Sequence, residues 1–390
     1  MKPLPKNLLC FSHLRWDFVY QRPQHLLTRF AKDMAVYFLE EPIFASTDVP
    51  YLTFSQRMPN LWVCVPYLPA HMEEAAVNQQ LRELIQVFFA NKEPQEFTFW
   101  YYTPMALKFT DHLTPGLTVY DCMDELAAFK FAPEELKILE EELFNRADVV
   151  FTGGASLYEA KKLNHPNTYL FPSSIDKPHF AKARTQPLEP ADQAGLQGPK
   201  IGFYGVIDER FDVELIQSIA QARPTWNIIL IGPVVKIDPA LLPQNANIHY
   251  LGARTYDQLP YYLSGWDVAL IPFLLNDSTR YISPTKTPEY LAGGKPVVST
   301  PIRDVVSPYG DRALVSIAQN AQEFIDAIEG WLGGSRKPWL DEVDAFLDTN
   351  SWDLTCADMS HAMVDTLNRS SYPILSLYGP TDAQGVEVAL

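Results

Sequence analysis

The chain has 390 residues, of which 47% are hydrophobic and 20% are charged. This balance is typical of a folded globular protein and excludes a disordered or fibrous one, and the length predicts two domains of ordinary size. The formal net charge of −16 excludes a basic surface for the phosphates of a nucleic acid, so no nucleic-acid partner is expected.

The charge is unevenly distributed along the chain. Residues 1–120 carry 10 Lys and Arg against 11 Asp and Glu, whereas residues 121–390 carry 21 against 36. If the protein touches an anionic membrane surface or a lipid-linked ligand, the first third is the part expected to do so. The sequence contains no apolar run of membrane-spanning length and no signal peptide, which predicts a cytoplasmic protein. The four cysteines are far apart, so we expect buried thiols and no metal site.

Buried strands and amphipathic helices alternate through the first half of the chain, which predicts an α/β domain with a mostly parallel sheet. No GxGxxG motif follows the first strand, which argues against a dinucleotide-binding domain. The strands are expected at residues 7–12, 35–39, 61–65, 97–102, 117–120 and 148–152. The helices are expected from residue 22 or 23 onward and at 75–89, 133–146 and 155–162.

Polar and aromatic side chains follow two of these strands, at the sheet edge where ligands bind in α/β proteins. The first loop and helix start carry groups that bind sugars, namely His13, Arg15, Trp16, Asp17, Gln21 and Arg22. The alternative is that the aromatic residues pack the loop and Arg22 is a surface charge. Asp121 and Asp124 follow the strand 117–120, and each is a candidate for ligand binding or proton transfer. Asp124 has the alternative of capping the next helix.

The alternation resumes after a polar stretch, residues 181–199, which contains three prolines and is expected to be an interdomain linker. Further strands are expected at residues 200–204, 226–231, 248–250, 268–273 and 295–300. Further helices are expected from residue 212 onward and at 285–291, 321–331 and 352–367.

The segment 281–300 carries the strongest functional signal. Ser283 and Pro284 predict an N-cap and first helical position, so the helix is expected to begin at Thr285 with Lys286 in its first turn. A helix start beyond the end of a parallel strand binds phosphate through free backbone N–H groups and the helix dipole. Glu289 lies one turn further and is placed to accept hydrogen bonds from ribose. The same pattern also occurs in α/β proteins that bind nothing there.

This segment resembles the donor-site signature of the retaining glycosyltransferases with the GT-B fold, a Glu-x7-Glu element followed by a helix and a Gly-Lys-Pro-Val-Val strand. The second Glu is Glu289, the strand is residues 294–298, and Tyr281 occupies the position of the first Glu. The segment 16–26 resembles the opening of a bacterial subgroup that makes cell-envelope or exopolysaccharides. Residues 168–180 resemble the end of the first domain in this superfamily.

The resemblance implies two Rossmann-like domains that face each other across a cleft. The first would span residues 1–180 and be joined by a C-terminal helix, 352–370, that crosses back to it. The second would span residues 200–350, and the tail 371–390 has no assigned role. The implied reaction is transfer of a sugar from a nucleotide sugar, most simply a UDP- or GDP-sugar, to an acceptor hydroxyl with retention and without a metal or other cofactor. The acceptor would be a saccharide or a lipid-linked saccharide.

The resemblance also assigns roles to residues. Arg210 follows Gly205 and matches the Arg that holds the diphosphate, while the usual Lys position is empty. We therefore hypothesise that Lys286, across the cleft, supplies the missing positive charge. Arg254 either stacks on the base or faces solvent. The donor site is expected to comprise Gly205, Arg210, Arg254, Tyr281, Ser283, Thr285, Lys286 and Glu289. The acceptor site is expected to comprise Arg15, Trp16, Asp17, Gln21 and Arg22, with His13, Asp121 and Asp124 as catalytic candidates.

Two other functions use the same fold. A sugar-nucleotide epimerase would release free nucleotide without an acceptor, whereas a phosphorylase would need a pyridoxal phosphate lysine, for which no signature is present. A non-catalytic donor-binding subunit is the other alternative, because Tyr281 replaces the first Glu and the usual Lys position is empty.

Overall fold

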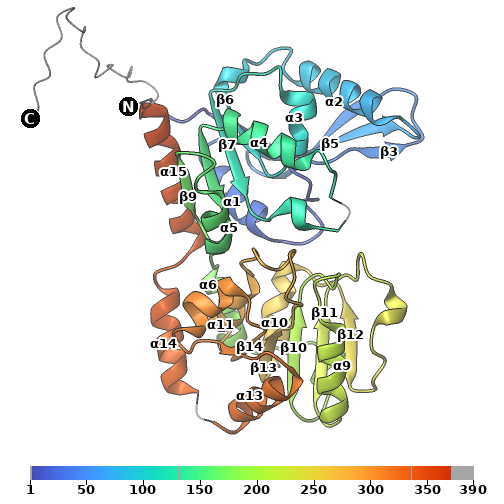
Figure 1. Cartoon of the computed structure of the whole chain (residues 1–390), viewed down its shortest axis with the longest axis vertical. Helices are drawn as coiled ribbons and strands as arrows, with labels where there is room; N and C mark the ends of the chain where they lie inside the picture. The colour runs from blue at the N-terminus through green and yellow to red at the C-terminus, as the bar shows by residue number, and fades with distance from the viewer. Residues whose placement is uncertain (1, 131, 335, 370–390) are drawn as a thin grey trace, which may run out of the picture.

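The computed structural model describes residues 2–130, 132–334 and 336–369. Within these residues the chain forms two α/β domains, each built on its own sheet and stacked along the long axis of the molecule (Figure 1). None of the helices in the described ranges has the length and apolar character needed to cross a bilayer. The predicted fold class, two Rossmann-like domains with largely parallel sheets, is confirmed.

The first sheet has the strand order β3-β5-β2-β1-β6-β7-β8-β9, and all of these neighbours pair in parallel. Its central strands are buried because helices cover both faces, which explains their continuous apolar sequences. The strands are β1 (Asn7–Phe11), β2 (Ala35–Leu39), β3 (Ile43–Ala45), β4 (Tyr51–Met58), β5 (Leu61–Pro69), β6 (Phe97–Tyr101), β7 (Leu117–Cys122), β8 (Val149–Thr152) and β9 (Thr168–Leu170). The helices are α1 (Arg22–Phe30), α2 (Glu74–Phe88), α3 (Leu107–Thr110), α4 (Leu136–Arg146) and α5 (Ala155–Lys161).

The second sheet has the order β12-β11-β10-β13-β14-β15 and is parallel throughout. The strand order reverses between β10 and β13, and such switch points are where ligands bind in open α/β sheets. The strands are β10 (Lys200–Tyr204), β11 (Asn227–Ile231), β12 (Ile248–Gly252), β13 (Val268–Ile271), β14 (Val297–Ser299) and β15 (Ser316–Ile317). The helices are α9 (Val213–Ala222), α10 (Leu259–Ser264), α11 (Lys286–Ala292), α12 (Arg303–Val305), α13 (Ala321–Gly333) and α14 (Lys337–Leu347).

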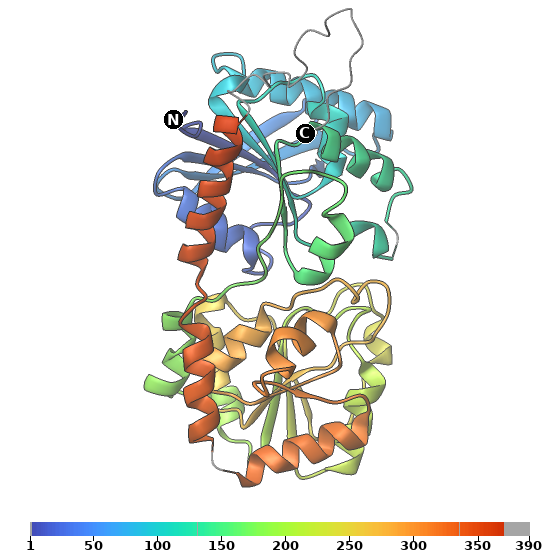
Figure 2. The same cartoon turned by 60° about the vertical axis from the view of Figure 1, so that its left-hand side comes forward.

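The last described helix, α15 (Trp352–Arg369), belongs to the core of the first domain although it follows the second domain in sequence. It runs along the side of the upper domain, continuing from α14 on the lower one (Figure 2). Trp352 is 1% exposed and stacks on His25 of α1 with ring centroids 4.6 Å apart. The side chains of Met359, Met363 and Leu367 are also buried in this core. The tail 371–390 lies outside the described residues.

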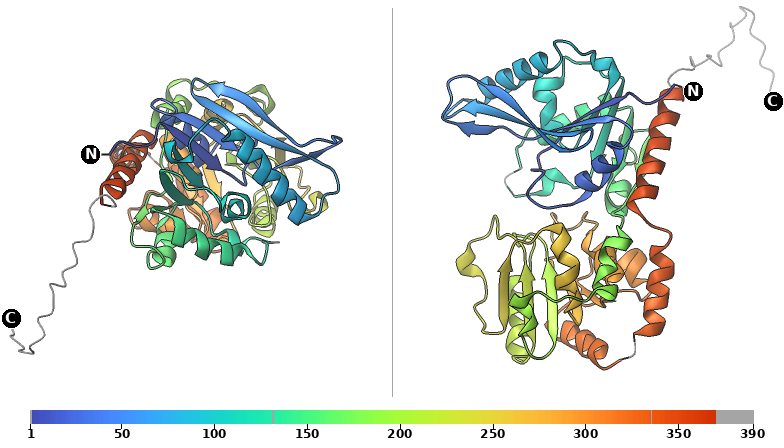
Figure 3. Two further views of the ribbon diagram at one scale, coloured as in Figure 1. Left: turned by 90° about the horizontal axis from the view of Figure 1, so that it is seen from above. Right: turned by 180° about the vertical axis from the view of Figure 1, so that it is seen from behind.

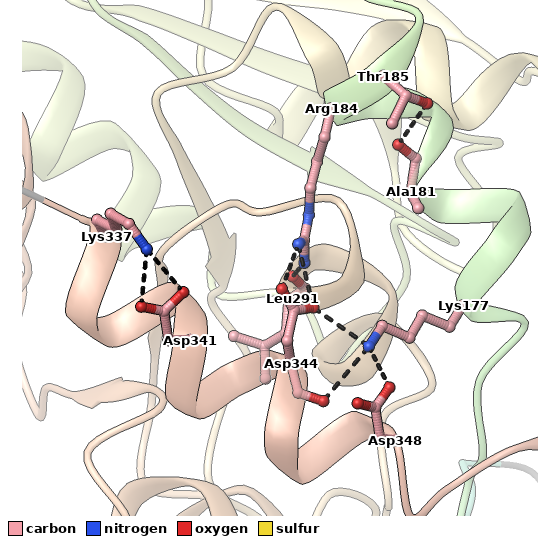
Figure 4. A network of polar contacts seen from close by, with 9 residues as sticks. All are labelled: Lys177, Ala181, Arg184, Thr185, Leu291, Lys337, Asp341, Asp344 and Asp348. Carbon is pink, nitrogen blue, oxygen red and sulfur yellow. Dashed lines mark hydrogen bonds and ion pairs between the residues drawn. The ribbon is translucent and has the colours of Figure 1, made fainter.

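The segment expected to be an interdomain linker, residues 181–199, is packed onto the second domain. It contains α7 (Lys182–Thr185) and α8 (Ala191–Ala194), preceded by α6 (Lys177–Phe180). Phe180 and Ala183 lie in the second domain's core. Figure 4 shows Arg184 bridging the Asp344 carboxylate and the carbonyl oxygen of Leu291, at 2.9 and 3.0 Å. The prolines interrupt regular structure, but the apolar side chains are still buried, and the chain changes domain within residues 171–176.

The structure contains other elements that the sequence pattern did not predict. An antiparallel strand, β4, precedes β5 and pairs with it, and its side chains are mostly exposed. These strands extend away from the rest of the first domain (Figure 3). An additional helix, α14, packs on α11. Helix α11 begins at Lys286, one residue later than predicted, and Thr285 rather than Ser283 occupies the N-cap.

We expect Trp352→Ala to lower the free energy of unfolding by about 3–5 kcal/mol, because the substitution leaves a cavity where α15 meets α1. Chemical denaturation followed by tryptophan fluorescence and circular dichroism measures this. Leu354→Ala on the same helix is the control, since Leu354 is 51% exposed and its loss should change stability by less than about 0.5 kcal/mol. Equal denaturation midpoints for the two variants would contradict the importance of this contact.

Candidate functional site

A pocket of about 200 Å³ lies between the domains, at the carboxyl ends of strands from both sheets. Because parallel strands all end at the same edge, loops distant in sequence meet there. From the first domain it is lined by residues 18–22, Met123, Asp124, Gly153 and Ser173. From the second domain it is lined by residues 204–206, Arg210, 231–233, Ala253, Arg254, Tyr256, Leu259, Phe273, 282–286 and Glu289.

The turn after β10 gives Lys286 its position. Gly205 has a φ of +139°, which side-chain-bearing residues rarely adopt. A Cβ atom on Gly205 would lie 2.2 Å from Cε of Lys286, so the lysine crosses directly over the turn. Its ammonium lies 5.7 and 5.5 Å from the ring centroids of Phe203 and Phe273. Burial lowers the pKa of Lys286, and the charge of Arg210 lowers it further.

Glu289 follows Lys286 by one turn of α11 and is 5% exposed. The hydroxyl of Tyr204, the last residue of β10, donates a hydrogen bond of 2.7 Å to its Oε2. Burial raises the pKa of Glu289, while the Tyr204 hydrogen bond and the charge of Lys286 oppose that rise. The pocket therefore holds an ammonium and a carboxylate that are both poorly solvated.

Arg210 is held rigidly at the rim of the pocket. Its Nε donates to Oδ1 of Asp208 at 3.0 Å, and its Nη2 donates to Oδ2 at 2.6 Å. Its guanidinium also lies 5.4 Å from the ring centroid of Phe129, in the first domain. The bidentate contact with Asp208 fixes the plane of the guanidinium before any ligand binds.

Asp124 is the first domain's carboxylate in the pocket. It follows β7, and burial raises its pKa to about 6, against the lowering effect of Arg210 and Lys286. The next turn, the short 3₁₀ helix η3 (Leu126–Ala128), has Glu125 as its N-cap, so the alternative capping role for Asp124 is wrong. Asp124 thus faces two cations that belong to the other domain.

Asp121 and Arg22, two of the predicted site residues, form a buried ion pair behind the pocket. Nε of Arg22 donates to both carboxylate oxygens of Asp121 at 3.1 and 3.0 Å, and Nη2 donates to Oδ1 at 2.8 Å. A third donor, Nη1, reaches the carbonyl oxygen of Phe171 at 2.7 Å. Arg22 lines the pocket, but Asp121 does not and is 0% exposed. The structure therefore gives Asp121 an anchoring position in place of the predicted catalytic one.

The first part of the predicted acceptor loop turns away from the pocket. Arg15 binds Glu40 at 2.9 Å, and Trp16 packs edge-on against Phe38. Asp17 pairs with an arginine of β4 at the surface. His13 does not line the pocket, and burial lowers its pKa to about 4, which keeps the ring neutral. From this loop, only residues 18–22 reach the site, including the predicted Gln21 and Arg22.

Of the predicted donor residues, one lies outside the pocket and another lies at its edge. Tyr281 lines a separate hollow beside Arg280 and α12, so it contributes no group to the pocket. Arg254 lies at the pocket edge, where its Nη2 donates to Asp192 at 2.7 Å and its Nε donates to the hydroxyl of Tyr262 at 2.6 Å. Its guanidinium is thus already paired with these two groups before any ligand binds. Ser283 and Thr285 do line the pocket, as expected.

The sequence did not predict the contacts that join the two domains at the site. Tyr20 stacks on Tyr256 across the domain boundary, with ring centroids 4.3 Å apart. Two polar contacts also join the domains, from the Ser173 hydroxyl to the Ser283 carbonyl at 2.7 Å and from the Ser156 N–H to the Asp304 carboxylate at 3.1 Å. These contacts pair residues far apart in the chain, so no local sequence signal could have predicted the pairing.

Two Rossmann-like domains with a pocket between their carboxyl edges define the GT-B class of folds. Several solved structures share it. Sucrose-phosphate synthase from Thermosynechococcus elongatus superposes with a TM-score of 0.68 at 16% identity, covering 94% of this chain and 100% of that one. Anabaena HepE, in complex with UDP and glucose, superposes with a TM-score of 0.66 at 14% identity, covering 94% and 99%.

Sequence comparison identifies the family of the second domain. Residues 198–333 match the family model described as Glycosyl transferases group 1. The predicted glycosyltransferase class is thus confirmed for this domain. A curated relative, the putative teichuronic acid biosynthesis glycosyltransferase TuaH of Bacillus subtilis (strain 168), is 24% identical over 227 residues. This alignment covers 54% of this chain and 57% of the relative, so it spans little more than half the length of either.

We expect Asp121→Ala to destabilise the protein by about 3–5 kcal/mol, because it leaves the buried guanidinium of Arg22 without its counter-ion. The free energy of unfolding from urea titration measures this loss. Asp17→Ala removes a carboxylate from a surface ion pair and should cost less than about 1 kcal/mol. A fully stable Asp121→Ala protein that had lost only its activity would contradict the anchoring role and restore the catalytic one.

Proposed function

We propose that the protein transfers a sugar from a nucleotide-diphosphate sugar to an acceptor hydroxyl. The observation that carries this proposal is the convergence of Lys286, Arg210 and Glu289 in one pocket beside Gly205. The family match of the second domain supports it, as does the likeness in fold to HepE, whose solved structure is a complex with UDP and glucose. The donor is most simply a UDP- or GDP-sugar.

The charges of the pocket suit departure of a nucleoside diphosphate. When the bond between the sugar and the diphosphate breaks, negative charge develops on the phosphate oxygens, and Lys286 and Arg210 are placed to stabilise it. Arg210 is already oriented by Asp208, so it needs little reorganisation. Glu289 is placed to accept hydrogen bonds from the ribose. As the family resemblance implies, transfer proceeds with retention and without an essential metal or other cofactor.

The acceptor enters from the first domain in this proposal. Asp124 is the carboxylate on that side, and its raised pKa suits a group that takes a proton from the acceptor hydroxyl near neutral pH. The new glycosidic bond forms to the oxygen that has lost this proton. Contact between the domains excludes water and so limits hydrolysis of the donor.

The acceptor is a saccharide or lipid-linked saccharide of a bacterial cell-envelope polysaccharide, a role suggested by the name of the Bacillus relative. The reaction takes place in the cytoplasm, where the first domain meets the membrane peripherally. Exposed aromatic side chains on its outer strands, Phe44, Tyr51 and Phe54, support this contact, as does the near balance of charge in residues 1–120.

A non-catalytic donor-binding subunit is the second candidate, favoured by the position of Tyr281 outside the pocket. Donor binding without turnover, for every acceptor tried, would support it. A sugar-nucleotide epimerase would instead release free nucleotide when no acceptor is present.

We expect one of the five nucleotides UDP, GDP, ADP, CMP and dTDP to raise the melting temperature of the metal-free protein, because a ligand that binds only the folded state stabilises it. Glu289→Ala and Lys286→Ala should each weaken binding about tenfold or more, since each removes a charge-assisted contact. Lys337→Ala is the control, because Lys337 is 81% exposed and lies on α14. No shift with any nucleotide would refute the proposed donor site. Unchanged KM and kcat in Lys286→Ala would refute the role of that lysine.

Asp124→Asn should lower kcat by about 10²–10⁴-fold while leaving nucleotide affinity nearly unchanged, because it removes a proton acceptor and not a diphosphate contact. In the unsubstituted protein, turnover should fall as the pH drops below about 6, where Asp124 becomes protonated. Steady-state kinetics with the donor identified by nucleotide binding, over a range of pH, measure both effects. Asp17→Asn at the surface is the matched control. If Asp124→Asn retained full turnover, the proton acceptor would have to lie elsewhere.

A further inference from the structure

Tyr204 stands between the second sheet and the carboxylate proposed to bind ribose. It is the last residue of β10, it lines the pocket, and it is 3% exposed. Its hydroxyl donates to Oε2 of Glu289 at 2.7 Å. In the described part of the chain no second protein donor forms a hydrogen bond with this carboxylate, so Oε1 is left for a ligand.

The ring of Tyr204 is held in place by contacts within the second domain. Its backbone N–H donates to the hydroxyl of Tyr290 at 3.0 Å, and that hydroxyl donates back to the Tyr204 carbonyl oxygen at 3.3 Å. The two rings pack edge to face at 4.7 Å, and Trp266 lies 5.9 Å from the Tyr204 ring. The hydrogen-bond donor that fixes Glu289 therefore belongs to the packed core of the domain and not to a loop.

The surroundings of Glu289 make this hydrogen bond important for its charge. Burial disfavours the ionised carboxylate and raises its pKa, and the Tyr204 hydroxyl and Lys286 are the groups that lower it. The other titratable groups around it are Tyr290 on its own helix and Tyr256 on η5 (Tyr256–Gln258), whose pKa values the carboxylate helps to raise. Without the Tyr204 hydroxyl, the Glu289 carboxylate would become protonated at a higher pH.

We propose that Tyr204 is a positioning residue that directs the free oxygen of Glu289 toward the ribose hydroxyls and so makes the site select ribonucleotides over 2′-deoxyribonucleotides. The inference rests on the proposed nucleotide-sugar function. A neutral carboxyl group accepts hydrogen bonds less well than a carboxylate, and an undirected one no longer presents its free oxygen to the ribose hydroxyls. Tyr204 therefore acts through Glu289.

The test uses Tyr204→Phe, which removes only the hydroxyl. Isothermal titration calorimetry with the nucleoside diphosphate that binds the unsubstituted protein, and with its 2′-deoxy form, is carried out from about pH 5.5 to 7.5. The upper limit keeps Lys286 protonated, because burial lowers its pKa from the ordinary lysine value. Tyr250→Phe is the matched control, because its hydroxyl donates to the Pro243 carbonyl outside the pocket.

We expect the unsubstituted protein and Tyr250→Phe to prefer the ribonucleotide by about tenfold, the effect of one charge-assisted hydrogen bond. In Tyr204→Phe this preference should largely disappear. Its affinity for the ribonucleotide should also be lost at a higher pH than in the unsubstituted protein, because Glu289 must be ionised to bind and is protonated more readily.

If Tyr204→Phe kept both the ribonucleotide preference and the same pH profile, the role of Tyr204 would be refuted while the nucleotide site stood. If the unsubstituted protein bound no nucleoside diphosphate, the proposed function itself would fail, and this inference with it. If Tyr204→Phe did not fold, Glu289→Gln would take its place as an uncharged group of the same shape. Low, pH-independent affinity and no ribonucleotide preference in Glu289→Gln support the inference, whereas retained preference overturns it.

Discussion

The site depends on the close approach of Lys286 to the backbone of Gly205. A Cβ at residue 205 would overlap the lysine side chain, and the positive φ of that residue excludes most other amino acids independently. The contact ties the start of α11 to the end of β10, at the reversal of strand order in the second sheet. Because Glu289 lies one turn beyond Lys286, the same contact determines where the carboxylate meets Tyr204.

Two groups of buried charges behave differently in this molecule. Arg22 and Asp121 satisfy each other almost completely, which is the arrangement that stabilises a fold without requiring a ligand. Around the pocket, Lys286, Glu289 and Asp124 are desolvated and have shifted pKa values. Keeping such groups poorly paired costs folding free energy, and sites of this kind are typically functional.

The two domains are held together mainly at one side of the pocket. Helix α15 returns to the first domain and its Trp352 is buried there, while α6 and α7 are packed on the second domain. The stacked Tyr20 and Tyr256 rings belong to the same side, because His25 contacts both Tyr256 and Trp352. Other contacts between the domains are smaller, such as the hydrogen bond from Ser173 to the Ser283 carbonyl and the packing of the Arg210 guanidinium near the Phe129 ring. Domains joined by a few connecting segments and small contacts can open for a ligand and close around it.

The sequence by itself determined the alternation of strands and helices, and its resemblance to the GT-B glycosyltransferases indicated the fold class and several of the second-domain residues that meet in the pocket. Hydrophobic periodicity and glycine positions are local properties, so the pattern of neighbouring residues was enough to place Gly205, Lys286 and Glu289 near strand ends. The tertiary structure alone decided that Asp121 pairs with Arg22, that residues 13–17 and Tyr281 turn away, and that the expected linker is packed. It also brought Tyr204 to Glu289 across 85 positions of sequence. These outcomes depend on contacts between segments far apart in the chain, which no local pattern encodes.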